Sequence, residues 1–376
     1  MMRTLPVLLL MLFAGCTEST TDPELTDSGV SSSETMQTDL FSFDAGGNKL
    51  VGMLDSPEDQ EATATIILVH GYGATNVVEQ NWYYNLRTRF AGLGINTLVW
   101  DKPGCGQSEG KFDINQPVES SAAEVVAAVR ALQDRNVKGS DKIGLWGISR
   151  AGWIAPLAMQ AEPAIDFWIS VSGTDDKENA RYLLASNFPI EGRTAEETEQ
   201  LVGEWQAQFN TGWQDATYQE YLDAAPNLRA DPFIALLGWN GVATEAEFLA
   251  YKAGYEAGAF VVDEQTELEV YVPDFRQLLA SLDKPVLALF GEKDTNVDWR
   301  STARLYRQTI GENPNAALSI QTFPDANHNM RQSKTGGVRE MQAQDGNTPY
   351  AEGYHEAMLN WLVAEGFGRP SASAAP

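Results

Sequence analysis

Short runs of consecutive apolar residues recur along the chain, and stretches with a helical spacing of apolar residues separate most of them. Continuous runs are typical of parallel strands that are buried on both faces of a sheet. The expected strands cover residues 39–43, 49–54, 65–69, 95–99, 142–146, 166–171, 285–290 and 317–323. The expected helices cover residues 82–93, 118–135, 151–161 and 299–310. The alternation predicts an α/β fold, a mostly parallel eight-stranded sheet with helices on both faces.

The first two expected strands are joined by the turn sequence Ala-Gly-Gly-Asn at 45–48, which predicts a hairpin and an antiparallel edge.

One long segment interrupts the alternation of strands and helices. Residues 174–282 contain no clear buried strand, and their 20 acidic and 6 basic residues lie among amphipathic, helix-like stretches. The simplest interpretation is a helical cap inserted into the α/β core, which then comprises residues 39–173 and 283–367. Residues 368–376 are expected to be a disordered tail.

The N-terminus has the features of a secretory signal. A basic start is followed by ten nearly all apolar residues, which are too few to span a bilayer. Residues 12–16, Leu-Phe-Ala-Gly-Cys, resemble a bacterial lipobox, so residues 1–15 are expected to be removed and Cys16 to be lipidated. Residues 16–38 are polar and are expected to be a flexible tether. This predicts attachment to the cell envelope through a lipid anchor at Cys16, on the periplasmic side or at the outer membrane of a bacterium; an ordinary signal peptide with a chance cysteine is the alternative.

Ser149 is the candidate nucleophile. It stands between an expected strand and an expected helix, flanked by Gly147 and Ala151, and a serine between small residues at such a turn is typical of a nucleophile elbow. A serine that only caps the helix is the alternative. Cys105 is a rival nucleophile, but no helix start follows it, so a small loop-filling residue is the favoured interpretation.

A histidine is expected to act as the base for a serine nucleophile. The chain has three. His328 follows the last expected strand, which places it at the same carboxyl edge of the sheet as Ser149, where ligands of open α/β sheets bind. His70 is expected to hold a loop, and His355 lies in an expected helix and is expected to be a surface or interface residue. His328 is therefore the predicted base.

The predicted acid is Asp294, which follows the expected strand 285–290 and so lies beside the predicted base. A carboxylate there would fix the histidine tautomer and stabilise its protonated form. Asp298, Asp175 and Asp176 are the alternatives, because they also follow strands.

A glycine-rich loop, His-Gly-Tyr-Gly at residues 70–73, follows the expected strand 65–69. Such a loop lets backbone N–H groups point at a substrate carbonyl. The N–H groups of Tyr72 and of Arg150, which directly follows the nucleophile, are the predicted oxyanion-hole donors.

The order Ser149, Asp294, His328, each after a strand, resembles the α/β-hydrolase superfamily. The loop 70–73 and the run Asp-Lys-Pro-Gly-Cys-Gly-Gln-Ser-Glu-Gly at 101–110 carry the same resemblance, although Lys102 stands near the position of an arginine in relatives. The segment 147–156, Gly-Ile-Ser-Arg-Ala-Gly-Trp-Ile-Ala-Pro, is similar to that of bacterial carboxylesterases and related serine aminopeptidase-like hydrolases.

This resemblance implies a serine hydrolase that cleaves carboxylic esters through an acyl-enzyme on Ser149. The expected substrate is a small acyl ester, and no metal or organic cofactor is needed. A peptidase or amidase on the same residues is one alternative, and a surface lipoprotein that binds ligands without turnover is another.

The net charge of −26, from 52 acidic and 26 basic residues, argues against two classes of partner. Nucleic acid phosphates and anionic lipid surfaces would both be repelled. No protein partner is evident from the sequence.

Overall fold

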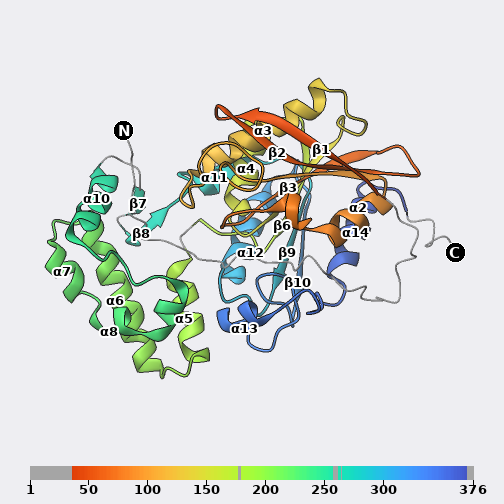
Figure 1. Ribbon diagram of the computed structural model, residues 1–376. Helices are drawn as coiled ribbons and strands as arrows, with labels where there is room; N and C mark the ends of the chain where they lie inside the picture. The colour runs from red at the N-terminus through yellow and green to blue at the C-terminus, as the bar shows by residue number, and fades with distance from the viewer. Residues whose placement is uncertain (1–35, 177–178, 257–260, 264, 371–376) are drawn as a thin grey trace.

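A single large sheet organises the molecule, which is described by a computed structural model for residues 36–176, 179–256, 261–263 and 265–370. The strands of the sheet are β1 (Met36–Ala45), β2 (Asn48–Pro57), β3 (Ala64–Val69), β4 (Ile95–Trp100), β5 (Ile143–Ile148), β6 (Ile165–Val171), β9 (Val286–Gly291) and β10 (Leu318–Phe323). Their spatial order is β1-β2-β4-β3-β5-β6-β9-β10. The β1–β2 hairpin and the β2–β4 pair are antiparallel, and the other pairs are parallel. The predicted α/β fold with a mostly parallel eight-stranded sheet is confirmed (Figure 1).

Helices cover both faces of this sheet. The helices packed on it are α1 (Val77–Gln80), α2 (Tyr84–Gly92), α3 (Val118–Asp134), α4 (Ala151–Ala161), α11 (Phe275–Ser281), α12 (Trp299–Gln308), the 3-10 turn η1 (Ile310–Glu312) and α14 (Tyr354–Ala364). Side chains of α1, α2 and α14 belong to one apolar core, and those of α3, α4, α11 and α12 belong to another. Both cores are needed because successive residues of a strand point to opposite faces.

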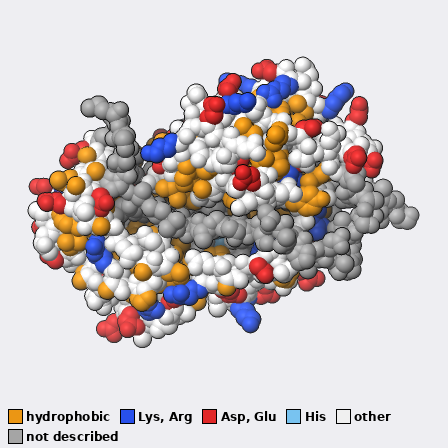
Figure 2. Space-filling model, viewed as in Figure 1, with side chains coloured by type: hydrophobic (Ala, Val, Ile, Leu, Met, Phe, Trp, Pro, Cys, Tyr) orange, Lys and Arg blue, Asp and Glu red, His pale blue; other side chains and the backbone are white. Residues whose placement is uncertain are grey.

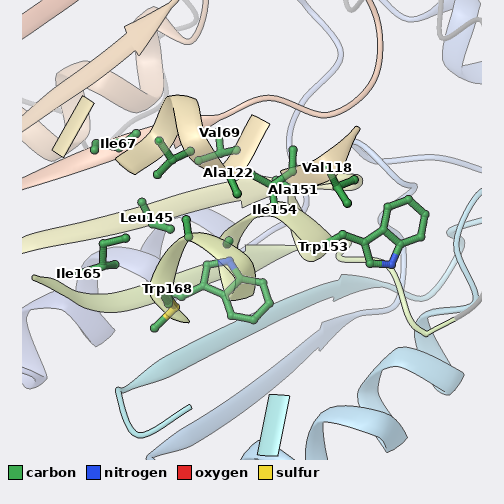
Figure 3. Close-up of a cluster of buried hydrophobic side chains, with 14 of the residues drawn as sticks. Ile67, Val69, Val118, Ala122, Leu145, Ala151, Trp153, Ile154, Ile165 and Trp168 are labelled. Carbon is green, nitrogen blue, oxygen red and sulfur yellow. The ribbon is translucent and has the colours of Figure 1, made fainter. Parts of the chain in front are cut away.

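Strand β3 shows this division. Ile66 and Leu68 face the core under α2 and α14, whereas Ile67 and Val69 face the core under α3 and α4. All four side chains are buried, which explains why the strand is a continuous apolar run in the sequence. Figure 3 shows part of the second core, where Ile67 and Val69 lie near Leu145 of the neighbouring strand β5.

The inserted segment forms a separate lobe at the left of Figure 1. Its helices are α5 (Ala180–Ile190), α6 (Ala195–Trp213), α7 (Tyr218–Asp223), α8 (Pro226–Ala230), α9 (Pro232–Leu237) and α10 (Glu245–Glu256). Helices α5, α6, α8 and α9 share an apolar core of their own, to which α13 (Val338–Ala343) contributes Val338. Acidic side chains are spread over the outer surface of this lobe (Figure 2), as expected for a solvated face.

Two details of the inserted segment differ from the sequence prediction. It contains an antiparallel hairpin of β7 (Val261–Asp263) and β8 (Leu268–Val270), and strands of three residues are too short to give a period-two pattern. In addition, α11 packs against the core of the sheet, so the chain rejoins the α/β core before residue 282.

Two other parts of the sequence prediction concern the chain ends. The signal peptide, Cys16, residues 17–35 of the tether and residues 371–376 of the tail lie outside the described residues. The described ends of both segments differ from the prediction: residues 36–38 belong to strand β1, and the N–H groups of Gly368 and Arg369 donate to the carbonyls of Leu362 and Leu93, so the tail begins as ordered chain. In the part of the chain that the structure describes, every helix is too short or too polar to cross a lipid bilayer.

Candidate active site

Ser149 occupies a sharp turn between β5 and α4. Its φ of 58° is in the left-handed region, which is unusual for a residue with a side chain and marks a backbone held under strain. The turn is fixed on both sides, because the Ser149 N–H donates to the carbonyl of Val171 at 3.0 Å and the Ser149 carbonyl accepts from the Gly152 N–H at 2.7 Å. The strand-to-helix turn predicted from the sequence is therefore present.

Small residues make this turn possible. A Cβ on Gly147 would lie 2.7 Å from the Cβ of Ala151, and one on Gly152 would lie 2.6 Å from the backbone nitrogen of Thr174. Both distances are shorter than real Cβ contacts, so neither position accepts a side chain without a shift of the backbone. The loop after β3 also lies close, since a Cβ on Gly71 would be 3.4 Å from the Cβ of Ser149.

Asp294 and His328 form a buried pair at the carboxyl edge of the sheet. His328 Nδ1 lies 2.8 Å from Asp294 Oδ2, and the side chains are 2% and 0% exposed. The other carboxylate oxygen of Asp294 accepts from the N–H groups of Asn296 at 2.8 Å and Val297 at 2.9 Å. The carboxylate is thus oriented by its own loop and directed at the imidazole.

The histidine loop is held by Asn327 and by a close approach to β9. Asn327 Oδ1 accepts from the N–H groups of Asn329 at 3.0 Å and Arg331 at 3.1 Å, and its amide donates to Gln344 at 2.8 Å. A Cβ on Gly291, at the end of β9, would lie 2.4 Å from the Ala326 carbonyl. Only glycine therefore allows the acid and histidine loops to meet this closely.

The alternative acids have other partners. Asp298 caps α12 by accepting from the N–H groups of Arg300 and Ser301, and Asp176 forms an ion pair with Arg276 at 3.0 Å. The backbone carbonyl of Asp175 accepts from the Trp153 indole at 2.6 Å. The structure brings Asp294, rather than these residues, to His328.

His70 and His355 lie near the site but are held differently. His70 Nε2 is 2.8 Å from the carbonyl of Trp100, in agreement with its expected loop-holding role, and burial lowers its pKa from 6.5 to about 3. His355 was expected to be a surface or interface residue, and the surface position is wrong: the side chain is buried and lines the same pocket as Ser149. Burial lowers the pKa of His355 to about 3 as well, with a smaller effect from Arg89.

The loop 70–73 borders Ser149 as predicted, and Lys102 anchors it. The half-buried Lys102 donates through its ammonium to the carbonyls of Gly71 at 2.6 Å and Gly73 at 2.7 Å, on either side of Tyr72. Burial, and then the nearby Arg150, lower the pKa of Lys102 to about 7. In the sequence, Lys102 is notable only because it stands near the position of an arginine in relatives. The sequence does not show that its partners are the carbonyls of Gly71 and Gly73.

Arg150 occupies the N-cap position of α4, so its N–H belongs to the first turn, where backbone donors have no partner within the helix. Its guanidinium donates to Ser121 Oγ at 3.1 Å and to the Gln116 carbonyl, and lies 5.3 Å from the ring centre of Tyr72. The side chain is thus directed away from the turn, which leaves its backbone N–H as the predicted donor.

Ser149 and His328 line one pocket with a volume of about 110 Å³, which Gly71 and Tyr72 also border. Cys105 is buried in a tight turn, where its N–H donates to the Lys102 carbonyl, and it is not on the lining of this pocket. Within the described ranges, no group of three or more His, Cys, Asp or Glu side chains is arranged to bind a metal ion. The arrangement therefore joins a serine hydroxyl, a histidine–carboxylate pair and a backbone loop.

A sequence profile described as "Alpha/beta hydrolase family" matches residues 66–338, which include Ser149, Asp294 and His328. None of the curated proteins with which the sequence was compared matches it. The esterase Pf2001 from Pyrococcus furiosus has a similar structure, with 14% identity, a TM-score of 0.50 and coverage of 88% of this chain and 91% of that one.

Two further solved structures resemble this one less closely. The acylaminoacyl peptidase from Pyrococcus horikoshii is 13% identical, with a TM-score of 0.48 and coverage of 88% of this chain and 42% of that one. Est1E from Butyrivibrio proteoclasticus, with ferulic acid bound, is 15% identical, with a TM-score of 0.47 and coverage of 86% and 98%. At 14% identity, the comparison with Pf2001 shows that the two proteins share a fold.

Proposed function

This chain belongs to the alpha/beta hydrolase family, and from that premise we propose that it hydrolyses carboxylic esters through an acyl-enzyme on Ser149. The observation that carries the proposal is the combination of a serine on a strained turn with a buried His328–Asp294 pair whose histidine lines the same pocket as the serine. Nucleophile, base and orienting acid are the three parts that acyl transfer on serine requires.

In the proposed reaction, Ser149 Oγ attacks the acyl carbon while His328 Nε2 takes its proton. Asp294 holds the imidazole by its Nδ1 side and stabilises the positive charge that forms. The backbone N–H groups of Tyr72 and Arg150 donate to the oxyanion, and each such donor contributes about 3 kcal/mol to transition-state stabilisation.

The tetrahedral intermediate then breaks its bond to the alcohol oxygen, which receives the proton from His328. The acyl group remains on Ser149 as an ester. Water next attacks this ester while His328 takes a proton from the water, and collapse releases the carboxylic acid and restores the serine. We expect esters because an alcohol leaves more readily than an amine.

The test is hydrolysis of 4-nitrophenyl acetate by the purified protein and by the Ser149→Ala variant, whose circular dichroism spectrum should match that of the parent. We expect turnover to be lost in the variant. A fluorophosphonate probe should label the parent and not the variant. Turnover that survives in Ser149→Ala and disappears in Cys105→Ala would reject the assignment.

The same experiment separates the alternatives. A peptidase or amidase would cleave an aminoacyl 4-nitroanilide faster than the matching 4-nitrophenyl ester, after correction for the uncatalysed rates. A protein that only binds ligands would neither turn over the ester nor react with the fluorophosphonate. Either outcome would replace the ester proposal.

We propose in addition that the chain is anchored in the cell envelope through a lipid on Cys16. The support is the sequence of residues 1–16 and the polar stretch that follows. The parent should sediment with membranes when expressed in a bacterium, and the Cys16→Ser variant should not. Equal release of both proteins into the soluble fraction would contradict the anchor.

A further inference from the structure

The chain returns from the cap to the sheet through a short segment that is anchored at both ends. Leu268, in β8, belongs to the apolar core of the cap, whereas Val272 belongs to the core under α3 and α4. Both of these side chains are buried. Tyr271 lies between the two anchors and packs half-buried against the core under α3 and α4, so its position is fixed at the junction of cap and sheet.

The ring of Tyr271 packs on the helix that follows the nucleophile. It stacks on Trp153 with ring centres 4.4 Å apart and an interplanar angle of 21°. Trp153 lies in the first turn of α4, close in sequence to Ser149 and Arg150, and its buried indole donates to the Asp175 carbonyl at 2.6 Å. The stacked ring is therefore in contact with the segment that carries one predicted oxyanion-hole donor, the N–H of Arg150.

The hydroxyl of Tyr271 contacts the residue that supplies the other predicted donor. It forms a side-chain hydrogen bond with Tyr72, and it donates to the Glu269 carboxylate at 3.4 Å. Glu269 is buried, and hydrogen bonds are stronger in such surroundings than in water. The Arg150 guanidinium lies 5.3 Å from the ring centre of Tyr72, so the side chains of Tyr72, Arg150 and Tyr271 form one cluster.

The spacing of the two donors decides whether an oxyanion hole works. Both N–H groups must lie about 2.7–3.1 Å from the same oxygen atom. Tyr72 follows β3 and Arg150 follows β5, so the two donors come from segments that are far apart in the sequence. Lys102 holds the carbonyls on either side of Tyr72, and Tyr271 adds a contact that spans both donor segments.

We propose that Tyr271 is a positioning residue for the oxyanion hole. Its ring on Trp153 and its hydroxyl on Tyr72 hold the two donor segments at the spacing that the oxyanion requires. Tyr271 is not among the described residues that line the pocket of Ser149 and His328, so it acts through its neighbours. This inference rests on the proposed esterase function and adds a residue to its machinery.

The first experiment measures the kinetics of 4-nitrophenyl acetate hydrolysis in two variants. Tyr271→Phe keeps the stacked ring and loses the hydroxyl, so we expect kcat to fall about fivefold with little change in KM. Tyr271→Leu also loses the ring contact, and its kcat should fall a further few-fold. A parental kcat in Tyr271→Phe, or a change in KM alone, would overturn the proposal.

The matched control is Tyr221→Phe. Tyr221 lies in α7 of the cap, is fully buried, and uses its hydroxyl to accept from the Val242 N–H at 2.8 Å. This variant loses a cap hydroxyl of comparable burial that packs with other cap residues, so its kcat should match that of the parent. An equal loss of kcat in Tyr221→Phe and Tyr271→Phe would show that any loosening of the cap has this effect, and the specific role would be rejected.

The second experiment uses 1,1,1-trifluoroacetone to probe the oxyanion hole directly. The Ser149 oxygen bonds to the ketone carbon, the serine proton passes to His328, and the carbonyl oxygen becomes an oxyanion like that of the tetrahedral intermediate. The inhibition constant should rise in Tyr271→Phe by the same factor as kcat/KM falls, because both depend on the same donors. A fall in kcat/KM with an unchanged inhibition constant would assign Tyr271 to another step and reject the proposal.

A double-mutant cycle tests whether Tyr271 acts through Tyr72. Tyr72→Phe keeps the backbone N–H and removes the same hydrogen bond from its other side. If the two hydroxyls act as a pair, the double variant should be no slower than the slower single variant. Losses of kcat that multiply would mean that the two side chains act independently, contrary to the proposal.

These measurements also separate this inference from the proposed function. If the parent does not turn over 4-nitrophenyl acetate, the esterase function is rejected, and the role of Tyr271 with it. If the parent turns the ester over and Tyr271→Phe does so equally well, only the role of Tyr271 is rejected.

Discussion

The hydroxyl of Tyr182, in the first helix of the cap, donates a hydrogen bond of 2.9 Å to the main-chain carbonyl of Asp294. Burial, and then the nearby Asp294 carboxylate, raise the pKa of Tyr182 to about 12, so the hydroxyl keeps its proton over the working pH range. The cap therefore makes a direct hydrogen bond to the loop that carries Asp294.

Tyr182→Phe removes this contact and keeps the ring. We expect the free energy of unfolding to fall by about 1 kcal/mol, the usual contribution of one hydrogen bond, and kcat to fall a few-fold because the acid loop is less well held. Urea unfolding and initial rates measure the two effects. Tyr84→Phe is the control, since Tyr84 is 48% exposed on α2, and an equal change in both variants would contradict the link.

Asp294→Asn tests the orientation of the histidine. An amide in place of the carboxylate no longer fixes the imidazole tautomer, so kcat should fall by about 10⁴-fold while the fold is retained. Asp298→Asn, four residues further along, alters only a helix cap and should cost at most about 1 kcal/mol of stability. Loss of activity in Asp298→Asn with activity kept in Asp294→Asn would exchange the two roles.

Lys102→Met tests the anchor of the oxyanion loop. The variant keeps the length of the side chain but leaves the carbonyls of Gly71 and Gly73 without their donor. We expect kcat to fall at least tenfold with little change in KM, because the loop acts on the transition state rather than on the bound ester. Lys138→Met removes a lysine that is 78% exposed and should match the parent. A rise in KM alone would show that Lys102 supports substrate binding instead.

Because His70 and His355 are buried, we expect the free energy of unfolding to fall at acid pH. Their pKa values are about 3 in the folded protein and near 6.5 in the unfolded chain, so the unfolded chain binds more protons between these limits. Stability is therefore full above pH 6.5 and falls as the pH drops towards 3, by up to about 1.4 kcal/mol per pH unit for each histidine. Urea unfolding between pH 7 and 5 should show a shallower fall in His355→Gln than in the parent. The same slope in both proteins would argue against a neutral, buried His355.

Gly152→Ala tests the packing behind the elbow. The added Cβ would meet the backbone nitrogen of Thr174 at 2.6 Å, and backbone does not give way easily, so we expect a loss of about 1–3 kcal/mol in unfolding free energy. Gly203→Ala makes the same change inside α6, where a Cβ meets nothing within 4 Å. That variant should instead gain about 0.5–1 kcal/mol through helix propensity. Similar losses in both would rule out a specific clash at Gly152.

The expected strands and the observed ones agree closely in the α/β core. The run 65–69 became β3 (Ala64–Val69), and the run 285–290 became β9 (Val286–Gly291). Such segments are predictable because a strand buried on both faces must be apolar along its whole length. Ser149, Asp294 and His328 could be placed for a related reason, since the ends of parallel strands meet at one edge of the sheet.

The features that were missed depend on contacts between distant segments. His355 was placed at the surface because a helical pattern shows which residues share a face and not what packs against that face. The hairpin of β7 and β8 was missed because its strands are too short to show a pattern. Lys102 and Gly71 are 31 residues apart, and only the fold brings the ammonium to the carbonyl.

The sequence by itself determined which segments form the strands of the sheet and which residues follow each strand at the carboxyl edge. Local apolar patterns are sufficient for this, because a strand that is buried on both faces must be apolar along its length. The tertiary structure decided which of these residues meet. It joined His328 to Asp294, anchored the loop of Tyr72 on Lys102 and formed the pocket of about 110 Å³ that Ser149 and His328 line. Distances and volumes of this kind arise from the packing of side chains from remote segments, and no local pattern encodes them.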